Sequence, residues 1–99
     1  MEYITIRIPK KEIIYDGKVR KTYGGQGKIR LNDRYLGNRA YVIFPLLRKN
    51  DGDGTIIAID EIKNKGVRPN NDHTAGIDLS KKYVGRKCIV VLQEEPITS

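Results

Sequence analysis

The chain has 99 residues and a formal net charge of +7, and 31% of its residues are charged, so it has the size of one domain with a single core. Its single cysteine excludes an intramolecular disulfide, and it has no Cys/His cluster that could hold a structural zinc. The longest apolar run, residues 40–47, is far shorter than the stretch of about 20 residues that a membrane-spanning helix needs.

Strands are expected from the start of the chain. Fourteen Ile and six Tyr stand against three Ala, a bias that favours strands over helices. The isoleucines of residues 4–8 alternate with more polar residues, which predicts a half-buried strand that Pro9 ends. We expect a turn at residues 16–17 and a second strand over residues 18–23. Residues 24–27 are glycine-rich but lack the Gly-Lys-Ser/Thr of a phosphate-binding loop, so they are interpreted as a joint.

The next part of the chain contains an internal repeat. Residues 27–44 (GKIRLNDRYLGNRAYVIF) align without a gap, at an offset of 48, with residues 75–92 (AGIDLSKKYVGRKCIVVL). The identical pairs are Ile29/Ile77, Leu31/Leu79, Tyr35/Tyr83, Gly37/Gly85 and Val42/Val90. Two copies indicate one pseudo-symmetric domain over residues 1–99, because an open solenoid needs about three repeats or more.

Each copy carries the signals of a strand, one helical turn and a second strand. Residues 28–31 alternate as a strand, and the apolar runs 40–44 and 88–92 are typical of central strands that are covered on both faces or closed by a second subunit. An N-cap, a hydrophobic staple and a stop recur at equivalent positions, namely Asn32 and Ser80, Leu31/Leu36 and Leu79/Val84, and Gly37 and Gly85.

The segments around the second copy complete the predicted fold. We expect a turn over residues 50–54, a strand over 55–59, a loop over 64–75 and a flexible tail over 93–99. Each half is therefore predicted to run strand, loop, strand, short helix, strand. The expected fold class is β-rich α+β, with two such pseudo-symmetric halves forming one compact domain.

The candidate motifs for catalysis or metal binding are weak. Residues 51–54, Asp-Gly-Asp-Gly, resemble part of a calcium loop, but Lys49 would stand at the first ligand position, so a turn is favoured. His73 is isolated in a predicted loop, which favours an exposed side chain, and Cys88 aligns with Ala40, which favours a small buried residue. We expect no catalytic residues, no metal and no cofactor, and hence no enzyme.

The positive charge is concentrated in the first half of the chain. Residues 1–49 carry twelve Lys or Arg against four Asp or Glu, whereas residues 50–99 carry seven against eight. Such asymmetry attracts a polyanion, which could be nucleic acid, an anionic membrane surface or an acidic partner. Seven basic residues fall within 22 positions, interleaved with tyrosines, and they are the candidate nucleic-acid contacts: Lys18, Arg20, Lys21, Lys28, Arg30, Arg34 and Arg39.

The alternative interpretation of these charges is a solvated, salt-bridged surface. Many charges together with few oxidisable residues are typical of thermostable proteins. Strand alternation places Lys28 and Arg30 on the face opposite Ile29 and Leu31, where they can form an exposed basic ridge, and the sequence leaves both interpretations open. A folded surface that gathers the basic residues would favour binding, and one that scatters them would favour solvation.

The repeat unit resembles a known module. The pattern Gly-Lys/Arg-Ile-x-Leu, a short capped turn, Tyr-Leu/Val-Gly-Arg/Lys and an apolar strand, in residues 27–44 and 76–92, is similar to the half-module of AbrB-like swapped-hairpin DNA-binding proteins. The resemblance implies DNA binding. In length, basic charge and Ile, Lys and Tyr content, the chain also resembles small proteins of filamentous and rod-shaped viruses of thermophilic archaea.

Two hypotheses follow from the sequence. The leading one is a non-enzymatic nucleic-acid-binding accessory or regulatory protein that contacts phosphates through the seven basic residues. The other is a structural or protein-interaction module, thermostable, in which an apolar strand face forms a homodimer. The N-terminal sequence MEYITIRIPKK lacks the layout of a signal peptide, so we expect no membrane insertion and a cytoplasmic location, in the host cytoplasm if the protein is viral.

Overall fold

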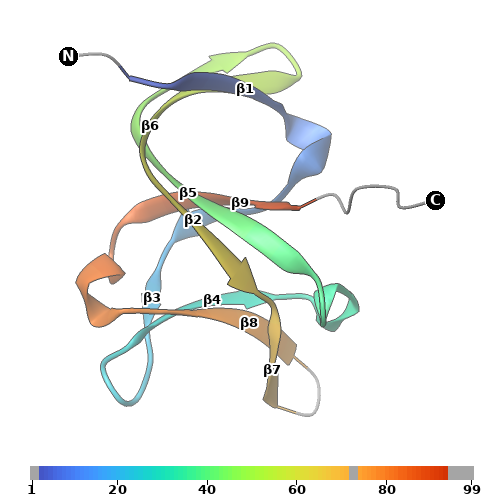
Figure 1. Ribbon diagram of the computed structural model, residues 1–99, viewed down its shortest axis with the longest axis vertical. Helices are drawn as coiled ribbons and strands as arrows, with labels where there is room; N and C mark the ends of the chain where they lie inside the picture. The colour runs from blue at the N-terminus through green and yellow to red at the C-terminus, as the bar shows by residue number, and fades with distance from the viewer. Residues whose placement is uncertain (1–2, 72–73, 94–99) are drawn as a thin grey trace.

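A computed structural model describes residues 3–71 and 74–93 (Figure 1). Within these ranges the strands are β1 (Thr5–Pro9), β2 (Ile13–Lys18), β3 (Arg20–Lys21), β4 (Gly27–Leu31), β5 (Arg39–Asp51), β6 (Gly54–Gly66), β7 (Arg68–Asn71), β8 (Thr74–Leu79) and β9 (Lys87–Leu92). Three single 3-10 turns join some of them, namely η1 (Lys10–Glu12), η2 (Asp33–Tyr35) and η3 (Lys81–Tyr83).

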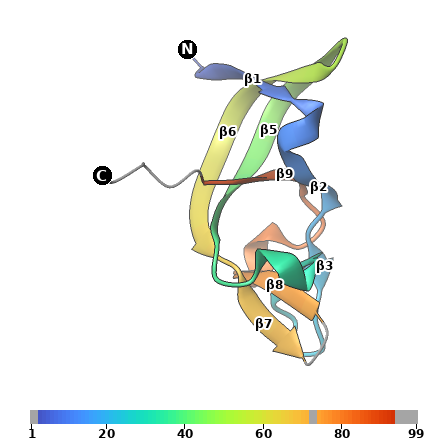
Figure 2. The same ribbon diagram turned by 90° about the vertical axis from the view of Figure 1, so that its right-hand side faces the viewer.

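The strands form two antiparallel sheets. The five-stranded sheet has the order β1-β6-β5-β9-β2, and the four-stranded sheet has the order β3-β4-β8-β7. Figure 2 shows the long β5-β6 hairpin running from the four-stranded sheet at the lower end to β1 at the upper end. The predicted β-rich domain is confirmed. The α+β class is not confirmed, because the helical elements of the described residues are turns of three residues each.

The two copies of the repeat pair with each other about a pseudo-twofold axis. In the four-stranded sheet β4 pairs with β8, and Ile29 lies opposite its own equivalent, Ile77. In the other sheet β5 pairs with β9, and Val42 lies opposite its equivalent, Val90. An antiparallel pair in which equivalent residues face each other has twofold symmetry about that point. Figure 1 accordingly shows η2 and η3 on opposite sides of the lower half.

The turns of the two copies form as the local sequence predicts. The Asn32 side chain accepts a hydrogen bond from the backbone N–H two residues further on, at 2.9 Å, and Ser80 does the same at 3.5 Å. Gly37 and Gly85 then adopt φ angles of 83° and 86°, a left-handed conformation that glycine reaches without steric cost. Both turns therefore begin and end on the predicted residues.

The structural repeat is longer than the sequence repeat. The Gly37 N–H donates to the Val67 carbonyl at 3.2 Å, and the Gly85 N–H donates to the Val19 carbonyl at 2.9 Å. Val19 and Val67 are both buried and are again 48 positions apart. The sequence predicts a loop over residues 64–75, of which the structure describes 64–71 and 74–75; these residues instead include the end of β6, then β7 and the start of β8. The loop prediction is wrong because β7 is too short and polar to give a strand pattern in the sequence. β7 forms because it pairs with β8.

The first third of the chain differs from the prediction over residues 13–23. Asp16 and Gly17 do not form a turn but lie in β2, where they pair with β9. The strand expected over residues 18–23 is reduced to β3, Arg20–Lys21. Register shifts between Ile13 and Tyr15 break the alternation of β2, so its sequence has no period of two.

The β5-β6 hairpin and the C-terminal segment match their predictions in part. The turn predicted over residues 50–54 is shorter in the structure, because residues 52–53 alone join β5 to β6, and β6 continues well beyond residue 59. The Gln93 N–H donates to the Arg39 carbonyl at 3.0 Å, so this first residue of the predicted tail is tied to β5. Residues 94–99 and His73 lie outside the described residues.

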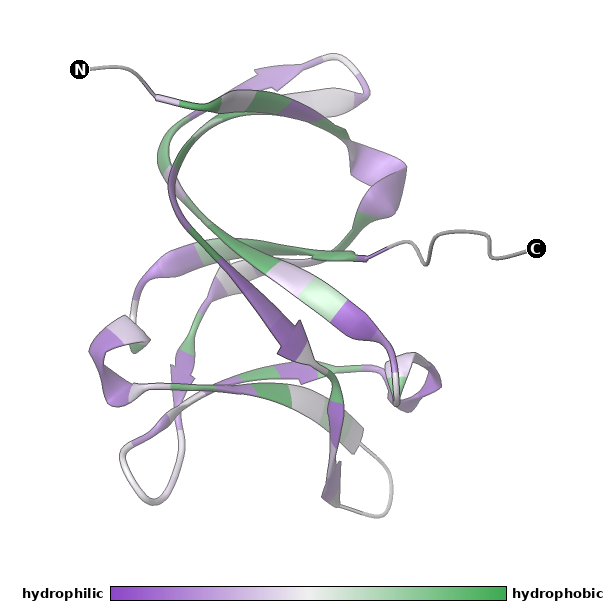
Figure 3. Ribbon diagram, in the orientation of Figure 1, coloured by the Kyte–Doolittle hydropathy of each residue, from purple (hydrophilic) through white to green (hydrophobic). Residues whose placement is uncertain are grey.

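Two clusters of buried side chains form the core. The larger one lies around the pairs β4-β8 and β5-β9 and contains the stacked rings of Phe44 and Tyr83, whose centroids are 4.8 Å apart. The smaller one lies in the upper part and consists of Ile8, Ile43, Ile57 and Ile89. In Figure 3 β5 and β9 are green where they cross in the middle, whereas η1 is purple. Cys88 is buried, as predicted.

Candidate functional site

The outer face of the four-stranded sheet carries basic side chains from three strands. The residues of β4 and β8 that face the core are buried, so alternation places Lys28 and Arg30 on the outer face. Residues that pair directly share a face, and Arg20 pairs with Lys28 while Arg68 and Arg30 both pair with Gly76. We call the following four residues the basic face: Arg20, Lys28, Arg30 and Arg68.

The Lys28 side chain extends over the basic face and contacts side chains of β7 and β8. Its Nζ donates to Asn70 Oδ1 at 2.7 Å and forms an ion pair with Asp78 Oδ1 at 3.0 Å, and its side chain is only 20% exposed. Gly76 lies beneath this side chain, and a Cβ there would be in ordinary contact with Lys28 Cδ, at 3.6 Å. The charge of Lys28 is therefore largely balanced within the protein.

The guanidinium groups of Arg30 in β4 and Arg68 in β7 are more available to an external anion than the Lys28 ammonium group. Arg30 and Arg68 are exposed, and no carboxylate among the described residues lies within ion-pair distance of either guanidinium. A guanidinium carries a permanent charge and donates paired hydrogen bonds that match the geometry of a phosphate. These two side chains are consequently the strongest anion-binding groups of the basic face.

Four of the seven predicted nucleic-acid contacts line one shallow groove of about 400 Å³, namely Arg20, Lys21, Lys28 and Arg30. Thr22, Tyr23 and Asn70 complete its lining. Tyr23, at the turn between β3 and β4, is fully exposed, and its ring contributes apolar surface beside the basic side chains. The groove therefore combines cations with an aromatic ring that is free to stack.

The other three predicted contacts lie elsewhere. Lys18, at the end of β2, lines a different cavity. Arg34 lies over the ring of Tyr35, 4.8 Å from its centroid, and donates to its hydroxyl at 2.6 Å. Arg39 donates to Asn64 Oδ1 at 2.6 Å on the five-stranded sheet. The seven residues are thus neither gathered into one face nor scattered at random.

Sequence reasoning missed one residue of the basic face, Arg68. The available signal was the offset of the repeat, because Val67-Arg68 follows Val19-Arg20 by 48 positions. The pairing confirms the equivalence, since Arg20 pairs with Lys28 and Arg68 pairs with Gly76, the equivalent of Lys28. Both copies therefore supply an arginine at the same place in the sheet.

A second basic group surrounds the buried ring of Tyr83. The hydroxyl of Tyr83 donates to the Glu61 carboxylate, and this hydrogen bond lowers the pKa of Glu61. Lys82 Nζ lies 5.1 Å and Lys63 Nζ 5.7 Å from the ring centroid. Lys63, Lys65 and Lys82 line a groove of about 380 Å³ beside the ring, and we call them the lysine cluster.

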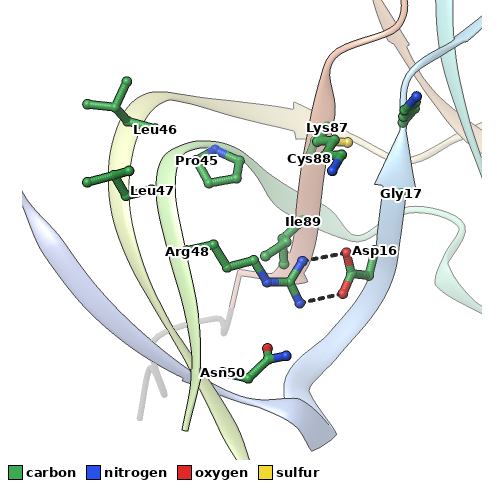
Figure 4. Close-up of a pocket in the computed structure, with 11 residues that line it drawn as sticks. Asp16, Gly17, Pro45, Leu46, Leu47, Arg48, Asn50, Lys87, Cys88 and Ile89 are labelled. Atoms are coloured by element: carbon green, nitrogen blue, oxygen red, sulfur yellow. Dashed lines mark hydrogen bonds and ion pairs between the residues drawn. The ribbon is translucent and has the colours of Figure 1, made fainter.

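A cavity of about 570 Å³ lies between β2, β5 and β9 (Figure 4). Arg48 closes one side by a paired contact, with Nη1 2.8 Å from Asp16 Oδ1 and Nη2 2.6 Å from Oδ2. This contact lowers the pKa of Asp16. The Cys88 thiol also lines the cavity, and burial raises its pKa to about 12. Arg48 and Asp16 thus neutralise each other, and the Cys88 thiol stays protonated at neutral pH.

The calcium-like segment has a structural role. The Arg7 guanidinium forms ion pairs with Asp51 at 3.2 Å and with Asp53 at 2.7 Å across the end of the hairpin.

Over the described part of the chain, no group of three or more His, Cys, Asp or Glu side chains is placed to hold a metal ion. In the same ranges, no helix has the length and apolar character needed to cross a membrane. No family model, curated protein or solved structure matches the chain.

Proposed function

We propose that this protein is a non-enzymatic accessory or regulatory protein that binds nucleic acid through the basic face and its groove. The observation that carries the proposal is the convergence of Arg20, Lys21, Lys28 and Arg30 on one groove, with the exposed ring of Tyr23 at its side. Neutralising phosphates by such groups releases counterions and provides most of the affinity of non-specific binding. The AbrB-like resemblance and the viral resemblance of the sequence stay predictions.

The proposal is tested by fluorescence anisotropy with labelled single-stranded and duplex oligonucleotides at several salt concentrations. The protein is expected to bind at low salt. The logarithm of its association constant should fall linearly with the logarithm of the salt concentration. The double variant Arg20→Glu/Arg30→Glu is expected to lose binding. The matched control Lys11→Glu/Lys49→Glu changes the same charge at exposed positions on η1 and β5 and is expected to bind almost as wild type. Absence of binding at low salt, or equal loss in both variants, would contradict the proposal.

A second candidate function is a homodimeric interaction module, and the edge strand β1 favours it. Among the strands of residues 3–71 and 74–93, β1 pairs with β6 alone, so within that part of the chain one of its edges has no strand partner. Ile4, just before β1, is 71% exposed. Leu47 is 67% exposed, and it lies in one row across the sheet with Thr5, because both residues pair with Ala58. Light scattering at high protein concentration would detect such a dimer, and Ile4→Lys is expected to disrupt it. A monomer at all concentrations would refute this candidate.

A further inference from the structure

We propose that the ligand is a single-stranded nucleic acid and that it runs along a continuous track from the basic face to the lysine cluster of the second half. This inference rests on the proposed function, since it names the form of the nucleic acid and the remaining contacts. It is carried by grooves that share lining residues and by the position of Tyr23.

Three grooves of similar size join end to end. The groove of the basic face shares Thr22 and Lys28 with a second groove of about 420 Å³. The second groove shares Lys65 and Ser80 with the groove of the lysine cluster, of about 380 Å³. The three grooves are therefore adjacent, and a chain-like ligand that leaves the basic face past Thr22 has the middle groove and then the lysine cluster next to it.

Each of the three grooves contains basic side chains. The lysine cluster adds three cations from the second half of the chain to the four of the first groove. The acidic side chain that lines the middle groove, Asp78, is already paired with Lys28 at 3.0 Å. Phosphates spaced along a strand would thus meet a basic side chain in each of the three grooves.

The shape of the track favours a single strand over a duplex. The track passes from the outer face of the four-stranded sheet to Lys63 and Lys65 on β6 of the other sheet. Duplex DNA has a persistence length of about 50 nm and does not follow such a change of direction within one small domain. Tyr23 is fully exposed beside the first groove, and an aromatic ring in this position stacks on unpaired bases, whose faces are covered in a duplex.

Lys65 is the most informative residue of the track. It is shared by the middle groove and the groove of the lysine cluster. Its neighbours are partly engaged, since Lys63 Nζ lies 3.6 Å from Glu61 Oε2 and Lys82 Nζ lies over the ring of Tyr83. Among the described residues, no carboxylate lies within ion-pair distance of Lys65, so its charge is available to a phosphate.

The test compares a labelled oligothymidylate of about 12 nucleotides with a duplex of the same length by anisotropy. The single strand is expected to bind at least about tenfold tighter. Lys65→Glu is expected to weaken single-strand binding about tenfold and Lys65→Gln to reduce the salt slope by about 0.7, the change for one lost phosphate contact. Tyr23→Ala is expected to weaken it about tenfold, whereas Tyr23→Phe keeps the ring and the affinity. Lys49→Glu and Tyr3→Ala, at exposed positions outside the track, are the matched controls.

The outcomes separate the two proposals. If neither form of nucleic acid binds at low salt, the proposed function itself is refuted. If the duplex binds as tightly as the single strand, and Arg30→Glu abolishes binding while Lys65→Glu and Tyr23→Ala have no effect, the proposed function stands and the single-strand track is refuted. A preference for the single strand together with losses at both Lys65 and Tyr23 supports the track. Circular dichroism of each variant verifies that it folds.

Discussion

Replacing Gly76 by alanine is predicted to destabilise the protein, because Gly76 lies against the backbone of the neighbouring strand β4. Replacing glycine by alanine in a strand would ordinarily stabilise a protein by about 0.4–1 kcal/mol, because it restricts the unfolded chain. At Gly76, however, a Cβ would lie 2.8 Å from the Ile29 carbonyl oxygen, whereas ordinary contacts are 3.4–4 Å. The obstacle is backbone at the centre of the β4-β8 pair, so neither strand can move without disturbing the core.

The expected cost of Gly76→Ala is about 1–3 kcal/mol, as for other overpacked sites. In a domain of this size 1 kcal/mol changes Tm by about 4–8 °C, so Tm should fall by at least about 4 °C. The matched control is Gly24→Ala, since no atom lies within 4 Å of a Cβ there and its φ is not positive. Its stability is expected to change by less than about 1 kcal/mol. Thermal and urea unfolding followed by circular dichroism measure both variants. A Tm for Gly76→Ala equal to or above that of wild type would refute the reasoning.

Three further predictions concern the titratable groups. Tyr83→Phe removes the hydrogen bond to Glu61, so an NMR titration should show the pKa of Glu61 rising toward its ordinary value, and an unchanged pKa would contradict the contact. Arg48 lowers the pKa of Asp16 in the folded state, so the stabilisation from this ion pair is present above the ordinary Asp pKa of about 4 and is lost as the pH falls through the lower folded value. Asp16→Asn should therefore be less stable than wild type at pH 7, by up to about 1 kcal/mol, and the difference should vanish in acid during urea unfolding. Burial raises the pKa of Cys88 to about 12, so a thiol reagent at pH 8 should modify it only in denaturant, and rapid reaction of the folded protein would be the contrary result.

The local chemistry of the repeat could be predicted from the sequence. Asn32 and Ser80 accept from backbone groups at the start of a turn, and glycine alone tolerates the conformation that follows at residues 37 and 85 without cost. These effects depend on a few neighbouring residues, which is why they can be predicted without the fold. The turns are too short to make the fold α+β, however, because strands precede and follow them closely.

The pairing of distant strands could not be predicted in the same way. Arg68 belongs to a short polar strand whose existence depends on β8, and no periodicity in residues 68–71 indicates it. The one usable signal lies upstream of residue 27, where the repeat offset of 48 still relates Arg20 to Arg68.

The candidate site was predictable only where strand alternation applied. Lys28 and Arg30 share a face because one residue separates them within β4. Arg34 and Arg39 are close in sequence, but Arg34 lies in the turn η2 and contacts Tyr35, whereas Arg39 begins β5 after that turn and contacts Asn64. The lysine cluster was missed for the opposite reason, because its members come from β6 and η3 and are joined only by the fold.

The most direct test of the proposed binding site is to map it in solution. A titration of isotope-labelled protein with the oligothymidylate, followed by amide chemical shifts, reports each residue that the ligand approaches. The proposed site predicts the largest changes in β3, β4 and β7 and at Lys65, with little change in β1 and η1. Largest changes along β1 or around the cavity of Arg48, or no changes at low salt, would contradict the site.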